Sequence, residues 1–417
     1  KKNKVLWSDR WQERWENLSS IRANLADGIL KTLDKKSNKG GGGGSNGDPP
    51  NPEAYEYYLK GKHIYDKRKN EHDIEIAIGF FKKAIELDVN LDEAQFSLAF
   101  YYKRNKKLDK FLKIIDKIKE KSIENRNKDL EARCLEYYSY YYDDLGDYDK
   151  SIELLDAASI IYNTTDNQNG IRNIYIAQCA ICYQKGEYEE ALKIGHRAQK
   201  ISDELEIEGI DHLHDNFTLI HWDLANYKDA FIHCQKSIDI ATELDYKSEL
   251  INPLNNMGLI FSSLWDKERA VKYYLKSVKI SKELNDPSGL IWPYINLSEE
   301  FRDVGNYDKA LDYLSKALDA SKKSADRPYD QCCILNNMGL NYYYKGKNNK
   351  AIKLLEESIE IQNKMDTTFI ISESTTYLYL CYKEKGIKYD VKSISECIIK
   401  HHSRSMYVDI YFSLYKL

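Results

Sequence analysis

Small residues recur along this chain at a spacing of about 40 residues, and this spacing limits what the chain can fold into. Each recurrence stands in a segment such as GNYDKALDYLSKAL, from Gly305, in which a turn precedes an amphipathic helix. One small column holds Ser151, Ala191, Ala230, Ala270, Ala310 and Ala351, at spacings of 40, 39, 40, 40 and 41 residues. A second column follows seven residues later, at Ala158, Ala198, Ser237, Ser277, Ala317 and Ser358. Self-similarity at such a period indicates a repeat architecture.

Each repeat is predicted to be a unit of two helices joined by a short turn, often of the form Gly-x-Tyr. About nine units fit between about Ala54 and about Ser405, because the columns continue more weakly through Ala77, Phe111 and Val391. Small residues at the crossing let the two helices approach closely, while Leu, Ile and Tyr at helical spacing fill the seam. A single unit cannot bury its apolar face, so neighbouring units must stack.

The pattern of small and aromatic residues resembles the tetratricopeptide repeat. Two units match its signature, at Gly258/Phe261/Ala270/Ser277 and at Gly339/Tyr342/Ala351/Ser358. The family's usual period is about 34 residues. The longer period here implies helices about one turn longer, similar to the repeats of kinesin light chains and Pins-type scaffold proteins. The resemblance implies an all-α, α-solenoid fold, a right-handed superhelix of about nine units over residues 53–405.

Composition and motifs exclude several classes of function. Lys and Arg total 62 against 66 Asp and Glu, a net charge of −4, and no basic stripe of the kind that binds nucleic acid is present. No apolar run reaches the roughly 18 residues of a membrane span. A Walker loop, HExxH, GxSxG and a Rossmann fingerprint are all missing, so we expect neither catalysis nor a cofactor.

The cysteines and histidines do not predict a metal site. Eight cysteines are scattered through helical segments, which favours reduced thiols and a cytoplasmic location. Cys179 and Cys182 form a CxxC, a spacing that on its own suggests metal or redox chemistry. They fall in the two first-helix columns that pack against the second helix, and free cysteine packs well in a core. The close pairs His212/His214 and His401/His402 lack partners that would complete a metal site.

Asparagine recurs at one position of the first helix. The sequence LNNMG occurs at 254–258 and again at 335–339, and its second asparagine stands 14 residues before the first small column. The same offset holds in four consecutive units, at Asn216, Asn256, Asn296 and Asn337. The first asparagines, Asn255 and Asn336, occur in only two units. An amide offers both a donor and an acceptor to a peptide backbone.

The tetratricopeptide resemblance gives this column a role. In such repeats the first helices line the concave face, and in kinesin light chains asparagines at the matching column hold an extended peptide. The alternative is that each asparagine caps or bridges adjacent helices. Helical spacing predicts that Trp292, Arg302 and Tyr343 also face the groove. The alternative for each of them is a solvent-exposed residue or one that packs in the seam between helices. The lining is mixed in charge and shows no dedicated clamp for a carboxylate.

The two ends differ from the repeats. Residues 1–34 carry Trp7, Trp11 and Trp15 at four-residue spacing, followed by apolar residues on one helical stripe. The stretch LWSDRW resembles a junction in bacterial proteins where a TolB-like domain precedes tetratricopeptide repeats, sometimes behind a nucleotide cyclase. The alternative is that residues 1–34 form an N-terminal cap that shields the first repeat. Residues 35–52 are a Gly-rich flexible linker, either natural or inserted. Residues 406–417 are predicted to be a capping helix or the first helix of an incomplete unit.

Three functions follow from these features. The first is a non-catalytic scaffold whose partner, a protein or peptide, lies extended in the concave groove along the asparagine column. The second is the regulatory or sensory repeat region of a bacterial adenylate or guanylate cyclase-type signalling protein, which rests on the LWSDRW junction. The third is a self-assembling structural module, a homo-oligomer formed through the apolar terminal helices.

Overall fold

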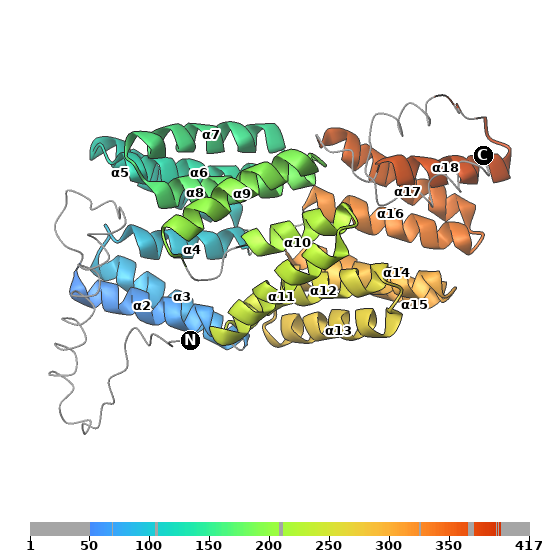
Figure 1. Cartoon of the computed structure of the whole chain (residues 1–417), viewed down its shortest axis with the longest axis horizontal. Coiled ribbons are helices and arrows are strands. Elements are labelled where there is room, and N and C mark those ends of the chain that lie inside the picture. The colour runs from blue at the N-terminus through green and yellow to red at the C-terminus, as the bar shows by residue number, and fades with distance from the viewer. Residues whose placement is uncertain are drawn as a thin grey trace, which may run out of the picture.

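The described part of this computed structural model comprises residues 51–68, 70–104, 107–207, 212–324, 327–365, 371–388, 390 and 392. Within it the chain forms α-helices joined by short turns, and no strand (Figure 1). The segments 1–34 and 406–417, residues 35–50 of the predicted linker and the second helix of the predicted ninth unit lie outside the described residues. Asn51 caps the first described helix through bonds to the backbone N–H groups of Glu53 and Ala54.

The helices alternate between first and second members of a unit. The first helices are α2 (Pro52–Asp66), α4 (Asp92–Arg104), α6 (Lys128–Asp144), α8 (Gln168–Gln184), α10 (Leu213–Asp223), α12 (Ile251–Ser263), α14 (Ser288–Asp303), α16 (Pro328–Tyr344) and α18 (Ile371–Lys385). The second helices are α3 (Glu71–Leu87), α5 (Leu108–Glu124), α7 (Tyr148–Thr164), α9 (Tyr188–Glu204), α11 (Tyr227–Glu243), α13 (Lys267–Glu283), α15 (Tyr307–Lys323) and α17 (Asn348–Lys364). A 3₁₀ turn, η2 (Lys247–Leu250), precedes α12. We number the units 1 to 8 from α2/α3 to α16/α17.

The turns between helices fix the period. Each of the eight second helices is 17 residues long. A residue with positive φ ends most helices, such as Gly305 with φ of 74° after α14 and Asn285 with φ of 48° after α13. Glycine adopts this left-handed conformation without strain. A first helix of 11–17 residues, a 17-residue second helix and the turns between them account for a period of about 40 residues.

The small columns lie in the seam between the two helices of a unit, as predicted. All six residues of the first column are fully buried. Two serines of the second column donate to a carbonyl of the first helix: Ser277 to Ile251 at 2.8 Å and Ser358 to Cys332 at 2.9 Å. A Cβ on Gly258 would lie only 2.4 Å from the Tyr274 ring, so this position requires glycine.

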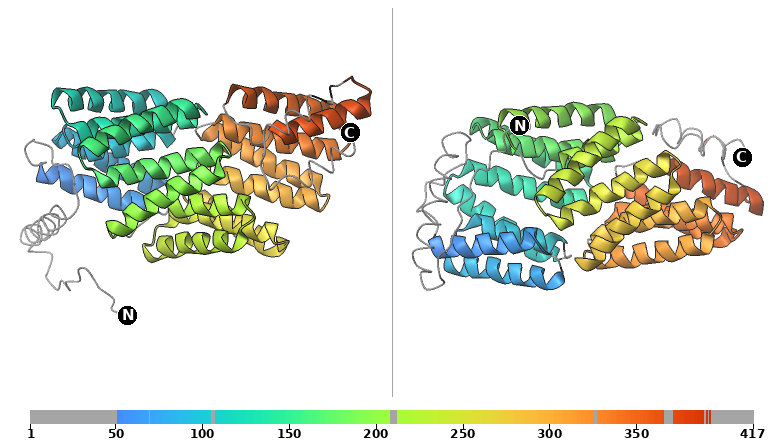
Figure 2. Two further views of the ribbon diagram at one scale, coloured as in Figure 1. Left: turned by 45° about the horizontal axis from the view of Figure 1, so that its top comes forward. Right: turned by 60° about the horizontal axis from the view of Figure 1, so that its bottom comes forward.

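The units stack with their first helices on the inside. Successive first helices contact one another from α6/α8 through α16/α18, and each second helix packs against its own first helix and the next unit (Figures 1 and 2). Buried side chains run through these contacts in adjoining clusters rather than in one central core. The predicted all-α, α-solenoid fold is confirmed. Among the described helices, none is long and apolar enough to cross a membrane.

The superhelix is tight enough for its successive turns to touch. The Arg104 guanidinium at the end of α4 lies 2.7 Å from the carboxylate of Asp286, which is 182 residues further along the chain. At Gly146, after α6, an added Cβ would meet the Met365 side chain at 3.1 Å. Figure 1 shows the junction of α2 and α3 beside the end of α11, where Lys67 donates to the carbonyl of Leu244. Units 1 to 3 therefore pack laterally against the loops of units 5 to 8.

Candidate functional site

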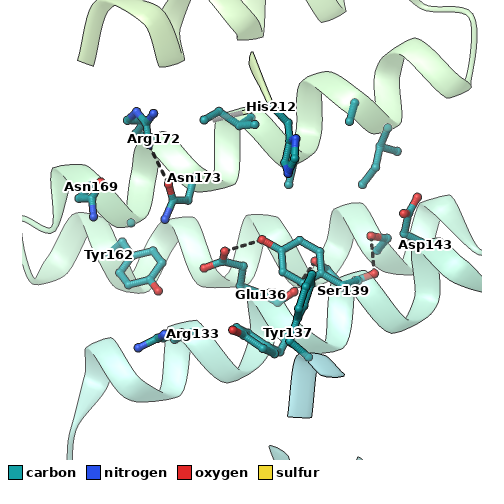
Figure 3. Close-up of a pocket in the computed structure, with 18 of the residues that line it drawn as sticks. Arg133, Glu136, Tyr137, Ser139, Asp143, Tyr162, Asn169, Arg172, Asn173 and His212 are labelled. Atoms are coloured by element: carbon teal, nitrogen blue, oxygen red, sulfur yellow. Dashed lines mark hydrogen bonds between the residues drawn. The ribbon is translucent and has the colours of Figure 1, made fainter. Parts of the chain in front are cut away.

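A cavity of about 850 Å³ lies on the inner face of units 2 to 5 (Figure 3). Its walls come mainly from the first helices α4, α6, α8 and α10. The polar and aromatic residues of the lining include Phe100, Lys103, Arg133, Glu136, Tyr137, Tyr140, Asp143, Tyr162, Asn167, Asn169, Arg172, Asn173, His212 and Asn216. Its volume is within the range of ordinary ligand pockets, roughly 300–1,000 Å³.

The sequence column that carries the asparagines passes through this cavity. Tyr137, Ala177 and Asn216 occupy that column in units 3, 4 and 5, at spacings of 40 and 39 residues, and all three line the cavity. Asn216 also donates from its Nδ2 to the carbonyl of Ile176, at 3.2 Å. The column therefore faces the concave side in these units.

Cationic side chains contribute much of the cavity's polarity. The Arg133 guanidinium lies 4.2 Å from the centre of the Phe96 ring, and within the described chain no carboxylate stands at ion-pair distance from it. Arg172 is buried and donates from Nε to the Ser202 hydroxyl at 2.6 Å and from Nη1 to Asn173 Oδ1 at 3.1 Å. Lys103 forms a 2.8 Å ion pair with Asp144.

A buried carboxyl group lies beside these cations. The Tyr140 hydroxyl donates to Glu136 Oε1 at 2.6 Å (Figure 3). Burial raises the pKa of Glu136, and the bond from Tyr140 and the charge of Arg133 oppose that rise. The pKa values of Tyr137 and Tyr140 are raised as well, mainly by burial, so both phenols stay neutral and can donate. The cavity thus combines hydroxyl, amide and guanidinium donors with two carboxyl groups, Glu136 and Asp143.

The other predicted asparagines mostly bridge neighbouring units. Asn296 Nδ2 donates to Asn255 Oδ1 at 2.8 Å, and Arg302 Nη1 donates to Asn337 Oδ1 at 2.7 Å. Asn336 contacts α18, the first helix of the following unit, where it donates to Glu373 and accepts from Ser374. The bridging alternative left open by the sequence therefore describes these residues.

Asn256 differs from its counterparts in the column. Its side chain is 5% exposed, yet it makes no hydrogen bond with any residue in the described ranges. Asn256 is the member of the column whose hydrogen-bonding capacity is unused.

The predicted aromatic candidates are packed rather than open. The Trp292 ring lies 5.8 Å from the Tyr329 ring and packs against the core of units 5 to 8. Tyr343 stacks edge-on with Tyr344 and Tyr377, and burial raises the pKa of Tyr343 to about 12. These candidates and the cavity residues belong to different units.

A second titratable group accompanies Arg302 in the inner layer. Burial raises the pKa of Glu299 to about 7, which Arg302 opposes and the nearby carboxylate of Glu373 reinforces. The Arg302 charge is in turn stabilised by Glu299 and Glu373. This network carries two carboxyl groups for one guanidinium, so it is more acidic than the cavity.

The CxxC cysteines are buried in the seam, where the sequence predicted them. Cys179 Sγ would lie 3.2 Å from a Cβ at Gly195. Burial raises the pKa of Cys179 to about 12 and that of Cys182 to about 11, so both remain thiols at neutral pH. Over the described ranges, no group of three or more His, Cys, Asp or Glu side chains is arranged to hold a metal ion.

The sequence analysis did not predict three polar residues of the cavity, one of which is the cationic Arg133. Arg133, Asn173 and His212 each stand four residues before the asparagine column, one helical turn earlier, and all three line the cavity. Residues at i and i+4 share a helix face. Their constant spacing from the asparagine column could have predicted that they face the cavity. They belong to units 3 to 5, however, whereas the asparagines of the column lie in units 5 to 8.

Comparisons with known proteins agree with the repeat architecture. Residues 251–284 and 290–364 match family models of the tetratricopeptide repeat. The APC/C hetero-tetramer Cut9–Hcn1 is similar with a TM-score of 0.55 and 16% identity, over 78% of this chain and 55% of that longer chain. A Rap protein complexed with competence and sporulation factor has a TM-score of 0.53 and 15% identity, over 82% and 99% of the two chains.

These likenesses define a class. The array is a tetratricopeptide-type solenoid. At identities of 15–16% the similar structures show the fold alone. No curated protein sequence matched this chain.

Proposed function

We propose that this chain is a non-catalytic scaffold that binds an extended peptide segment on its concave face. The observation that carries the proposal is the 850 Å³ cavity on the inner helices, lined by the column that the repeat register assigned to the groove. A solenoid of the same fold, the Rap protein, is complexed with competence and sporulation factor. That complex supports a ligand-binding role for the fold.

The lining defines the chemistry of the ligand. Asn173 and Asn216 offer amides to a peptide main chain, as asparagines do in the kinesin light chains that this period resembles. Arg133 and Arg172 provide guanidinium groups that match a carboxylate in shape and charge. We therefore propose that the bound segment places an acidic side chain or its C-terminal carboxylate between α6 and α8. Asn256 extends the amide surface toward unit 6.

The test is selection of random twelve-residue peptides on the whole chain, followed by affinity measurements on variants. We expect Arg133→Gln and Asn216→Ala each to weaken the selected peptides about tenfold or more, which corresponds to roughly 1.4 kcal/mol. Acidic residues should be enriched among the peptides. Circular dichroism establishes that each variant remains folded.

The matched control is Asn163→Ala. Asn163 lies exposed on the second helix α7, and its amide bonds only to the carbonyl of Ser159 in the same helix. Its removal should leave affinity unchanged. Peptides that bind both cavity variants as well as wild type, or a selection that yields none, would refute the proposal.

The alternative functions rest on other parts of the chain. A regulatory role beside a nucleotide cyclase depends on residues 1–34, and self-assembly depends on 1–34 and 406–417, all outside the described residues. The groove therefore provides the more direct basis for a function.

A further inference from the structure

Oppositely charged groups meet where successive turns of the superhelix touch. At the first contact, Lys67 after α2 donates to the carbonyl of Leu244, 177 residues away, and lies 3.8 Å from Asp245. At the second, Arg104 pairs with Asp286 at 2.7 Å. Each contact joins the end of a first helix to a loop about four and a half units further along.

The third contact places Arg327, before α16, against the end of α6. Its Nη2 lies 3.9 Å from Asp143 Oδ2 and its Nε lies 3.8 Å from Asp144 Oδ1. Asp144 is also paired with Lys103. Units 1, 2 and 3 thus each carry one charged contact to the next turn, in the same register.

The third contact is electrostatic and lacks a close hydrogen bond, whereas Arg104 donates directly to Asp286 at 2.7 Å. Arg327 Nε and Asp143 Oδ1 are both buried, and within the described ranges neither atom has a hydrogen-bond partner. Burial raises the pKa of Asp143, and Arg327 opposes that rise. A buried ion pair without good hydrogen bonds adds little stability, because desolvation offsets the attraction. The third contact therefore contributes little stability of its own, and the attraction between the turns depends mainly on the first two contacts.

The junction borders the cavity. Lys103 and Asp143 line the cavity and belong to the third contact, and Arg104 follows Lys103 directly in α4. A solenoid flexes by small rotations between units, and each rotation accumulates along the array. Separation of the turns would therefore change the width of the inner face at the cavity.

We propose that the pairs Lys67–Asp245, Arg104–Asp286 and Arg327–Asp143/Asp144 form an electrostatic latch that holds successive turns of the superhelix closed. Release of the latch extends the solenoid and opens its concave face. The latch concerns the unliganded chain, so it stands independently of the proposed peptide binding.

Small-angle X-ray scattering of the whole chain tests the latch. We expect Asp286→Arg, which puts two like charges at the second contact, to raise the radius of gyration. The charge swap Arg104→Asp with Asp286→Arg should return it to the wild-type value. Wild type should also extend between 0.1 M and 1 M NaCl, because the screening length falls from about 10 Å to about 3 Å.

The matched control is Asp312→Lys, which reverses an exposed pair with Lys316 inside α15 and should change nothing. An unchanged radius of gyration in the reversal variant and in high salt would overturn the latch. If the reversal variant loses helicity, the salt series on wild type decides alone, and a constant radius rejects the proposal.

Discussion

At the scale of single residues, two of the four asparagines in the column, Asn256 and Asn337, have different surroundings. Asn337 accepts from Arg302 and donates to the carbonyl of Cys333, whereas Asn256 has no hydrogen-bond partner in the described structure. They stand 81 residues apart in identical LNNMG contexts. The difference arises from the neighbouring units, because unit 7 presents Arg302 toward Asn337.

This contrast predicts unequal effects on stability. Asn337→Ala removes the acceptor of the half-buried Arg302 guanidinium, which should lower the free energy of unfolding by about 1–3 kcal/mol. Asn256→Ala removes an amide with no protein partner, so its cost should stay below about 0.5 kcal/mol. Urea unfolding of the two variants beside wild type measures both values. Equal destabilisation would show that Asn256 also has a structural partner.

The sequence predicted which residues share a face, but not which atoms pair. The spacing placed Asn216 in a column that faces the cavity, because helical register follows directly from residue number. It did not predict the Asn296–Asn255 bond, since that bond depends on how two neighbouring first helices are rotated. The contact of Arg133 with Phe96 joins units 2 and 3 and was missed for the same reason.

At the scale of helices, the seam decides which glycines are required. In α12 an added Cβ at Gly258 would lie 2.4 Å from the Tyr274 ring, whereas in α3 an added Cβ at Gly79 meets nothing within 4 Å. Both glycines have helical neighbours on either side. The sequence predicted the role of Gly258 because it occupies a repeat column, and Gly79 lies outside those columns.

Alanine at these two glycines should therefore have opposite effects. Gly79→Ala should stabilise the chain by about 0.5–1 kcal/mol, because alanine favours the helix interior. Gly258→Ala should destabilise it by about 1–3 kcal/mol through overpacking against Tyr274. Thermal unfolding measures both. Stabilisation by Gly258→Ala would contradict the close packing of the seam.

Several histidines lie close together where helices α9, α10 and α11 meet. The sequence did not predict this cluster. His214 Nδ1 and His233 Nδ1 lie 3.1 Å apart, and the His221 ring is parallel to that of His233. Burial lowers the pKa of His233 to about 4, helped by His214, His221 and Lys236 and opposed by Asp229. His214 and His221 lie on α10 and His233 on α11, so their clustering is a tertiary feature.

The His233 pKa predicts acid sensitivity. The folded pKa lies below the ordinary value of about 6.5, so His233 contributes stability that is present above pH 6.5 and is lost as pH falls toward about 4. Since the ring is partly exposed, the loss should be about 1–2 kcal/mol. Unfolding at pH 7.5 and pH 5 compares wild type with His233→Gln. Equal losses in both proteins would contradict the prediction.

At the scale of the whole molecule, the repeat predicted the solenoid but not its pitch. A regular period establishes that neighbouring units stack in one way. The pitch depends on small rotations at each junction, and on contacts between residues such as Arg104 and Asp286 that no sequence spacing relates. The ion pairs between successive turns depend on that tight pitch, so they became visible only in the structure.

Site-specific photo-crosslinking tests directly whether the ligand binds on the concave face. A photoreactive phenylalanine analogue replaces Tyr140 in the cavity or, as a matched aromatic control, the exposed Phe231 on the second helix α11. The probe is the peptide of highest affinity from the selection. We expect a covalent adduct at position 140 and none at 231. An adduct at 231 with none at 140 would contradict it.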